Sequence, residues 1–145
     1  MNSSANKQKY PIIAVDIIVE DKNRILLGKF TEKWTDKGKY SYGLPGSEIQ
    51  FGETIGNTVK RTILEQLGCE VLEYKIIGVN ANYAYNSHYV SVAIVAKIQG
   101  EPRVVSSDDW QSWEWFEATS LPEKLFDSAK YAIESYRTKT FTVSE

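Results

Sequence analysis

Two pairs of side chains on one stretch of the chain have the spacing of a shared helix face. Arg61 and Glu65 lie four residues apart, and Thr62 and Gln66 repeat that spacing one residue later. Polar groups at these intervals, at the end of a loop, could hold Mg²⁺ and a phosphate group. A plainer interpretation is a surface helix on which Arg61 and Glu65 only pair with each other. The spacing alone leaves both interpretations open.

The loop before this face carries glycines where a ligand needs close access to the backbone. Gly46 follows a proline, and Gly52 directly precedes Glu53. Glycine lets the backbone approach a bound group closely, and the N-terminus of a helix favours anions. The loop and the helix together therefore indicate a site for Mg²⁺ and a diphosphate.

An apolar stripe on the opposite face predicts the helix that carries these residues. Thr54 is a suitable start and Gly68 a suitable stop, so we expect a helix from Thr54 to Leu67, weakened somewhat by Gly56. The stripe repeats at every fourth position, at Ile55, Val59, Ile63 and Leu67.

The remaining elements are predicted as strands around this helix and one further helix. Residues 12–20 form a nearly continuous apolar run rich in β-branched side chains, as in a strand buried on both faces. This strand is predicted to form a hairpin with a second strand at 24–30. Further strands are predicted at residues 40–45, 70–85, 88–98 and 113–116. A helix is predicted at 120–138, with Pro122 in its first turn. This order predicts a mixed sheet packed between helices.

Composition and charge narrow the class of protein. With 145 residues, 42% of them hydrophobic, the chain is expected to form one domain at 11–145 after a flexible polar tail at 1–10. The net charge of −2 argues against a nucleic-acid or anionic membrane partner. The single cysteine excludes an intrachain disulfide, and no apolar run has the length of a membrane span, so a cytoplasmic protein is expected.

The stretch from Leu44 to Val71 resembles the Nudix box, G-x5-E-x7-R-E-U-x-E-E-x-G-U, in which U is an aliphatic residue. Similar segments flank it, such as ILLGK before the box and SWEWF after it, so that the resemblance runs from Ile12 to about Phe126. Seven residues fall in register with the box, of which the first replaces its leading glycine: Ser47, Glu53, Arg61, Ile63, Glu65, Gly68 and Cys69.

The resemblance implies a protein of the α/β class with the Nudix fold, an α/β/α sandwich around a mixed sheet. It implies a MutT-like hydrolase of a nucleoside triphosphate or another nucleoside diphosphate-linked compound, in which water attacks phosphorus with Mg²⁺ or Mn²⁺. The implied catalytic residues are Glu53, Arg61 and Glu65. The implied ligands of a weakly bound metal are Gly46, Glu65 and Gln66. Many members of the family are homodimers, so a homodimer is also expected.

The box departs from the family pattern where carboxylates are expected. Thr62 replaces the glutamate of R-E, and Gln66 replaces the second glutamate of E-E. Gln50 and Ser106 also occupy places where many relatives carry glutamate. Loss of a general base typically costs roughly 10²–10⁴ in rate, so hydrolysis is expected to be weak. Glu48 and Glu53 are the box acids that could replace the base.

Two other functions stay open. One is a catalytically inactive Nudix-fold module that binds a nucleotide or another ligand, which the missing carboxylates favour. The other is a GDP-sugar glycosyl hydrolase, because these enzymes also lack the R-E glutamate and use a loop histidine as base. That histidine falls near Trp110 here, whereas the only histidine of the chain, His88, is expected to be structural.

Loops outside the box hold the residues predicted to contact a substrate. Trp34 and Tyr42 lie on or near loops around the expected cleft and can stack on a nucleobase. Lys39 lies between them and can contact a phosphate. Asp108 and Asp109, close in sequence to Ser106, could supply a substitute metal ligand.

Overall fold

The structure, a computed structural model, describes residues 10–144, so the expected tail at 1–10 lies almost wholly outside the described residues. The strands are β1 (Ile12–Asp21), β2 (Arg24–Phe30), β3 (Tyr42–Gly43), β4 (Gly46–Glu48), β5 (Glu70–Ala84), β6 (Ser87–Gln99), β7 (Trp110–Glu117) and β8 (Thr142–Ser144). The helices are α1 (Ile55–Leu67) and α2 (Asp127–Thr138), with a 3-10 turn at Glu32–Trp34. Within the described residues, no helix has the length and apolar character needed to cross a membrane.

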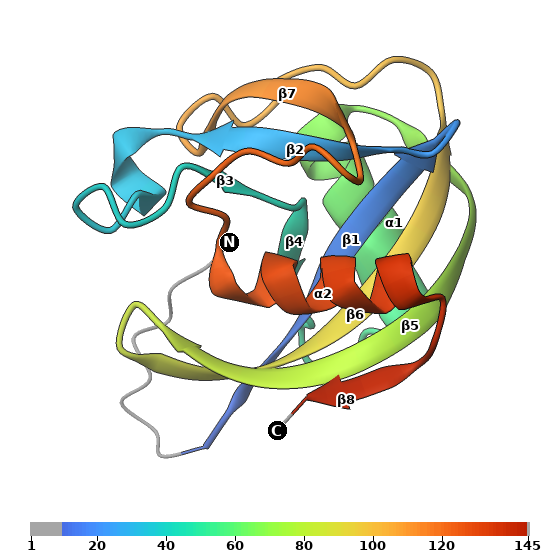
Figure 1. Cartoon of the computed structure of the whole chain (residues 1–145). Coiled ribbons are helices and arrows are strands. Elements are labelled where there is room, and N and C mark those ends of the chain that lie inside the picture. The colour runs from blue at the N-terminus through green and yellow to red at the C-terminus, as the bar shows by residue number, and fades with distance from the viewer. Residues whose placement is uncertain (1–9, 145) are drawn as a thin grey trace.

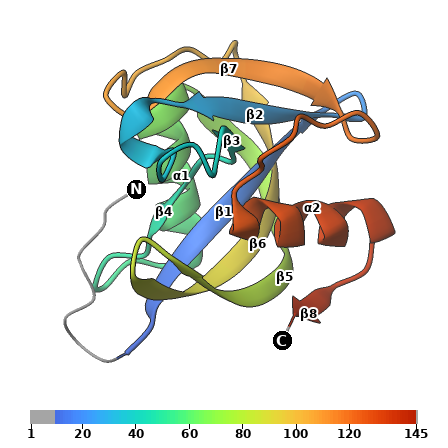
Figure 2. The ribbon, with the colours of Figure 1, turned by 60° about the vertical axis from the view of Figure 1, so that its left-hand side comes forward.

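The strands form one mixed sheet in the order β3-β2-β1-β6-β5-β8, with β4 added to β1 and β7 added to β2. Strand β1 runs parallel to β6 over eight paired residues, whereas β4 lies antiparallel to β1 with Gly46 opposite Asp16. In both views β2 and β7 lie side by side at the top, away from β5 and β8 (Figure 2). The mixed sheet predicted from the order of elements is therefore present.

The two helices cover opposite faces of the sheet, with α2 in front and α1 behind (Figure 1). Side chains of a strand alternate between its two faces, so β1 contributes to both cores. Val15, Ile17 and Val19 pack in the core beneath α1, whereas Ile18 belongs to the core beneath α2. Two apolar layers, one on each side of the central sheet and each covered by a helix, give the α/β/α sandwich that the Nudix resemblance implies.

Helix α2 begins later than the sequence predicts. We expected a helix from residue 120 with Pro122 in its first turn, but α2 starts at Asp127. The backbone before it pairs with the β3 region instead, because Ser41 N donates to the Lys124 carbonyl at 2.8 Å and Phe126 N donates to the Tyr42 carbonyl at 2.9 Å. Lys124 also has φ of 58°, in the left-handed region, which interrupts a right-handed helix.

Candidate functional site

Helix α1 forms where the sequence predicts it and turns its polar face towards β4. The Thr54 hydroxyl caps the first turn by accepting a hydrogen bond from Asn57 N at 3.1 Å. Gly68 ends the helix with φ of 70°, which glycine adopts without strain. The apolar stripe is fully buried at Val59, Ile63 and Leu67. The stripe thereby fixes the direction in which the polar residues of α1 point.

Arg61 joins the loop before α1 to the helix. Its Nε donates to Glu53 Oε2 at 2.7 Å, and its Nη2 donates to Glu53 Oε1 and to the Glu48 carbonyl, each at 2.9 Å. Its Nη1 donates to Glu65 Oε1 at 2.9 Å. The structure therefore brings together the three residues predicted to be catalytic, Glu53, Arg61 and Glu65.

Both carboxylate oxygens of Glu53 are occupied by donors. Besides the two bonds from Arg61, Glu53 Oε1 accepts from Gln50 N at 2.8 Å and from the Thr58 hydroxyl at 3.1 Å. The Arg61 guanidinium, followed by the Gln50 amide, lowers the pKa of Glu53 to about 2. In this arrangement Glu53 anchors the loop to the helix, and its catalytic role stays a prediction.

Gln66 is paired with the backbone of Gly46 in both directions. Gln66 Nε2 donates to the Gly46 carbonyl at 2.8 Å, and Gly46 N donates to Gln66 Oε1 at 3.3 Å. This pattern of one donor and one acceptor on each partner determines which amide atom of Gln66 is which. The side chain that replaces a box glutamate thus holds β4 against α1 by two hydrogen bonds.

The second replaced glutamate position is closed by a pair of hydroxyl groups. Thr62 is fully buried, and its hydroxyl donates to the Thr58 carbonyl at 2.7 Å. Because that bond uses the only proton of Thr62 Oγ1, the Ser47 hydroxyl is the donor in the bond between Ser47 and Thr62. Two residues that differ from the box pattern therefore satisfy each other.

The predicted metal ligands do not fit a resident Mg²⁺ ion in this arrangement. Mg²⁺ requires near-octahedral oxygen ligands, usually with one or two carboxylates among them. The Gly46 carbonyl and Gln66 Oε1 are occupied by each other's donors, and Glu65 pairs with Arg61. Over residues 10–144 no group of three or more His, Cys, Asp or Glu side chains could hold a metal ion. Gly46, Glu65 and Gln66 are near neighbours, and metal binding by them stays a prediction.

A cleft of about 580 Å³ lies over this part of the box. Three residues with carboxylates line it, Glu48, Glu65 and Asp109, together with the guanidinium of Arg61. The lining therefore carries a net negative formal charge. Ser106 also lines the cleft, where its hydroxyl donates to the Glu65 carbonyl at 3.2 Å. The cleft is large enough for a diphosphate. Because the lining is negatively charged, a diphosphate bound there requires a cation beside it.

The three residues predicted to contact a substrate lie elsewhere. Trp34 is buried, and its Nε1 donates to Asp109 Oδ1 at 2.7 Å, so it supports one wall of the cleft without lining it. The Tyr42 hydroxyl donates to Glu114 at 3.3 Å, and Lys39 lies over the Tyr40 ring at 5.1 Å. Trp34, Tyr42 and Lys39 are absent from the lining of the cleft among the described residues, and their contact with a substrate stays a prediction.

His88 likewise lies apart from the cleft. Its ring stacks on Tyr83, with 4.8 Å between the ring centroids, at the start of β6. It is not part of the cleft lining in the described structure, so no observation here favours histidine-based glycosyl hydrolysis.

Sequence reasoning missed two buried polar residues on the α2 side of β4, Asp16 and Asn82. Asp16 is 8% exposed and Asn82 is 7% exposed, and both line a small cavity beside Gly46. Burial raises the pKa of Asp16 to about 6, although hydrogen bonds with Ser128 and Ser91 act in the opposite direction. One signal was available, because Asp16 is a carboxylate within an otherwise apolar strand that we expected to be buried on both faces.

Comparison with known proteins agrees with the fold and with the Nudix resemblance. Residues 11–136 match the model of the NUDIX domain family. A curated ADP-ribose pyrophosphatase of Methanocaldococcus jannaschii is 30% identical over 132 residues, covering 90% of this chain and 76% of that protein. A solved MutT NUDIX hydrolase of Burkholderia pseudomallei has a TM-score of 0.80 and 28% identity, covering 88% of this chain and 98% of that one. A MutT protein of Methanosarcina mazei, with a TM-score of 0.74 and 17% identity over 92% of this chain and 98% of that one, is alike in fold.

Proposed function

The chain belongs to the NUDIX domain family, and on that premise we propose that it hydrolyses the diphosphate bond of a nucleoside diphosphate-linked compound or a nucleoside triphosphate. The Nudix resemblance and the α/β/α fold predicted from the sequence are confirmed. The family and the ADP-ribose pyrophosphatase relative support a pyrophosphohydrolase, as the sequence led us to expect.

The observation that carries this proposal is the clamp formed by Arg61. It holds Glu53, Glu65 and the Glu48 carbonyl around the cleft, so hydrogen bonds within the chain fix the loop to α1. Glu65 is 54% exposed at its side chain and lines the cleft, where it can accept a proton from an attacking water. Glu53 and Arg61, the other residues predicted to be catalytic, hold each other in place beside it.

The excess of carboxylates in the cleft suggests how a diphosphate enters. An anionic substrate alone would be repelled by Glu48, Glu65 and Asp109. We therefore propose that the substrate enters as its complex with Mg²⁺ or Mn²⁺, so that the cation belongs to the substrate. Family members generally use divalent metals. Because Thr62 and Gln66 supply no carboxylate, turnover is proposed to be weak.

A second function, a ligand-binding module without catalysis, is favoured by the closed pairs at the two replaced glutamate positions. Gln66 with Gly46, and Thr62 with Ser47, leave no uncompensated group that a catalytic metal would have to satisfy. In this alternative the cleft binds a nucleotide and releases it unchanged.

The test is product formation from a panel of nucleoside triphosphates and nucleotide sugars, including ADP-ribose, with excess Mg²⁺ and then Mn²⁺. Glu65→Ala, prepared in parallel, reveals any contaminating hydrolase. We expect slow turnover that disappears in Glu65→Ala, and the released products identify the bond that breaks. Absent turnover, or turnover unchanged in the variant, would contradict hydrolysis of that panel, and nucleotide binding without product would then support the binding module.

The proposals of a homodimer in solution and a cytoplasmic location accompany this function. Light scattering coupled to size-exclusion chromatography tests the first, with a mass near twice 16.5 kDa expected.

A further inference from the structure

A small polar cavity lies on the α2 side of β4, separate from the pairs that close the α1 side. Its volume is about 20 Å³, enough for one water-sized group, since roughly 10–15 Å³ of such space holds a water. Ser47 and Glu48 line both this cavity and the cleft over the box, so the cavity and the cleft adjoin along β4. A ligand in the cleft would enter the cavity by passing around β4, which pairs only with β1.

Asp16 reaches this cavity because of the alternation along β1. Its neighbours Val15 and Ile17 point to the α1 core, so Asp16 points to the α2 side, where the Ser91 and Ser128 hydroxyls hydrogen-bond to it. Gly46 lies opposite Asp16 in the sheet, and a Cβ there would come within 3.0 Å of Asp16 Oδ1. The glycine thus gives the carboxylate the space it occupies.

Two oxygen atoms in this cavity have no donor among the described residues. They are Asp16 Oδ2 and Asn82 Oδ1, both buried. The orientation of the Asn82 amide follows from Ser91, whose hydroxyl uses its one proton in the hydrogen bond with Asp16, so that Ser91 Oγ accepts from Asn82 Nδ2 at 3.1 Å. Asn82 therefore presents its oxygen, an acceptor, to the same cavity as the carboxylate. Buried polar atoms are nearly always hydrogen-bonded, so this pair calls for a donor.

We propose that Asp16 Oδ2 and Asn82 Oδ1 form a subsite that accepts hydrogen bonds from an amino group of the ligand's base. This rests on the proposed function only in taking the ligand to be a nucleotide. An exocyclic amino group has two N–H donors on one small nitrogen, which matches two acceptors in a cavity of this size. A carbonyl at the same place of the base brings a third acceptor and leaves the buried oxygens unsatisfied. The subsite therefore selects amino-bearing bases over their oxo or unsubstituted counterparts.

The test is the affinity of the whole protein for nucleoside diphosphates in matched pairs, measured by calorimetry with excess Mg²⁺. CDP and UDP differ by an amino group or a carbonyl at one ring position, GDP and IDP by the presence of an amino group, and ADP and purine riboside diphosphate likewise. In at least one pair we expect the amino-bearing member to bind about tenfold more tightly or better, as for a hydrogen bond to a charged group. Asp16→Asn should remove most of this preference, because an amide loses the charge and brings its own N–H donors.

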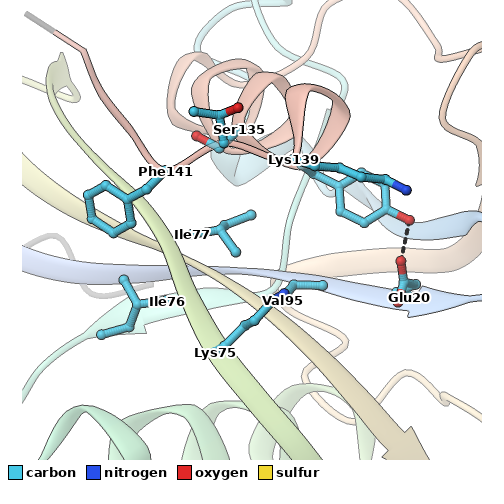
Figure 3. Close-up of a pocket in the computed structure, with 10 residues that line it drawn as sticks. Glu20, Lys75, Ile76, Ile77, Val95, Ser135, Lys139 and Phe141 are labelled. Carbon is cyan, nitrogen blue, oxygen red and sulfur yellow. Dashed lines mark hydrogen bonds between the residues drawn. The ribbon is translucent and has the colours of Figure 1, made fainter.

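A matched control lies on the same strand and the same side of the sheet. Glu20 accepts a hydrogen bond from the Tyr136 hydroxyl, beside a separate hollow of about 390 Å³ at the end of α2 (Figure 3). Glu20→Gln makes the same change from carboxylate to amide outside the subsite, so the preference should be retained. Should Asp16→Asn fail to fold, Asn82→Ala removes the second acceptor and should also reduce the preference.

The outcomes separate this proposal from that of hydrolysis. A preference for amino-bearing bases that Asp16→Asn abolishes supports the subsite even where no product forms. Equal affinities within every pair, a preference that persists in both Asp16→Asn and Asn82→Ala, or no binding of any nucleoside diphosphate would overturn it. A buried water would then be the occupant of the cavity. Hydrolysis with no base preference would leave the proposed function standing and remove only the subsite.

Discussion

Strand β4 separates two polar regions that differ in how their hydrogen bonds are satisfied. On the α1 side, Gln66 pairs with the Gly46 backbone and the Ser47 hydroxyl pairs with Thr62. On the α2 side, Asp16 Oδ2 in the cavity beside Gly46 has no donor among the described residues. Both regions border the same strand, yet the hydrogen bonds of one are complete within the protein and those of the other are not.

This difference separates polar residues that stabilise the fold from polar residues that lack a partner within the protein. A buried donor or acceptor without a partner costs about 1–3 kcal/mol, so a closed pair stabilises the fold while an open acceptor weakens it. On the α1 side, the pairs formed by Thr62 and Gln66 therefore hold the box in place although its two glutamates are replaced. The α2 side retains a local cost that only a ligand or a water offsets, as is common at functional sites.

The largest effect is expected from Asp16→Asn, which should make the protein more stable at neutral pH. The folded-state pKa of Asp16 is raised to about 6, above the unfolded value near 3.9, so the folded state binds the proton more tightly. Ionisation therefore weakens the fold as the pH rises from about 4 to 6, and the full cost remains above 6. A pKa difference of this size corresponds to at most about 3 kcal/mol.

Urea unfolding of both proteins at pH 4, 5 and 7.5 measures this effect. The stability gained in Asp16→Asn should be small at pH 4 and increase towards pH 7.5. The acidic pKa of Glu53 also makes stability depend on pH at the acid end, but that contribution is common to both proteins and cancels in their difference. Equal stabilities at every pH would mean that Asp16 is not strained by its burial, and the contrast between the two sides of β4 would weaken.

Gly46→Ala should disturb both regions at once and destabilise the fold by about 2 kcal/mol. The added Cβ would lie 2.6 Å from the Val15 carbonyl oxygen, so β4 has to move away from β1. That movement pulls Gly46 from Gln66 on one side and opens the cavity of Asp16 on the other. Thermal unfolding measures the loss, and a stability equal to that of the wild type would show that β4 adapts freely.

Much of the fold was predictable because the local sequence patterns of α1 and β1 agree with the structures they adopt. The stripe, cap and stop of α1 predict the helix within one residue, and the β-branched run predicts β1. The start of α2 was not predictable, because the backbone around Lys124 pairs with the β3 region rather than continuing a helix. A contact of that kind depends on the tertiary structure and leaves no periodic signal in the sequence.

The site was predictable only where its residues are neighbours in sequence. The spacing of Arg61 and Glu65 correctly indicated their contact across one helix turn. The cavity of Asp16 and Asn82 joins side chains from β1 and β5, and its open acceptors appear only when all neighbouring donors are known. The aromatic residues expected at the cleft were chosen by loop position, and for Trp34 burial in the core prevailed instead.

Gln66→Glu should convert the closed pair into a site that responds to a divalent cation. A carboxylate cannot donate to the Gly46 carbonyl, so two acceptors face each other there, and a cation would relieve their repulsion. We expect excess Mg²⁺ to stabilise Gln66→Glu by about 1.4 kcal/mol at ten times its dissociation constant, relative to EDTA, and to leave the wild type unchanged. Gln66→Met, which also removes the amide donor but adds no charge, is the control and should not respond. Mg²⁺ stabilisation of the wild type itself would contradict the closed pair.

The smallest effect is expected from Thr62→Val, which keeps the shape of the side chain and removes its hydroxyl. Thr62 is fully buried and bonds to both Thr58 and Ser47. Its loss leaves the Ser47 hydroxyl without its partner on α1, and a destabilisation of about 1 kcal/mol is expected. Urea unfolding is sensitive enough to measure a change of this size.

The double variant Ser47→Ala with Thr62→Val decides whether the hydroxyls act as a pair. If each hydroxyl is satisfied by the other, removing both should destabilise the protein by less than the sum of the two single changes, because neither group is then left unmatched. Additive losses would show that Ser47 and Thr62 are stabilised by separate contacts. The α1 side of β4 would then be closed by Gln66 alone, and the contrast with Asp16 would rest on one amide rather than on two coordinated replacements.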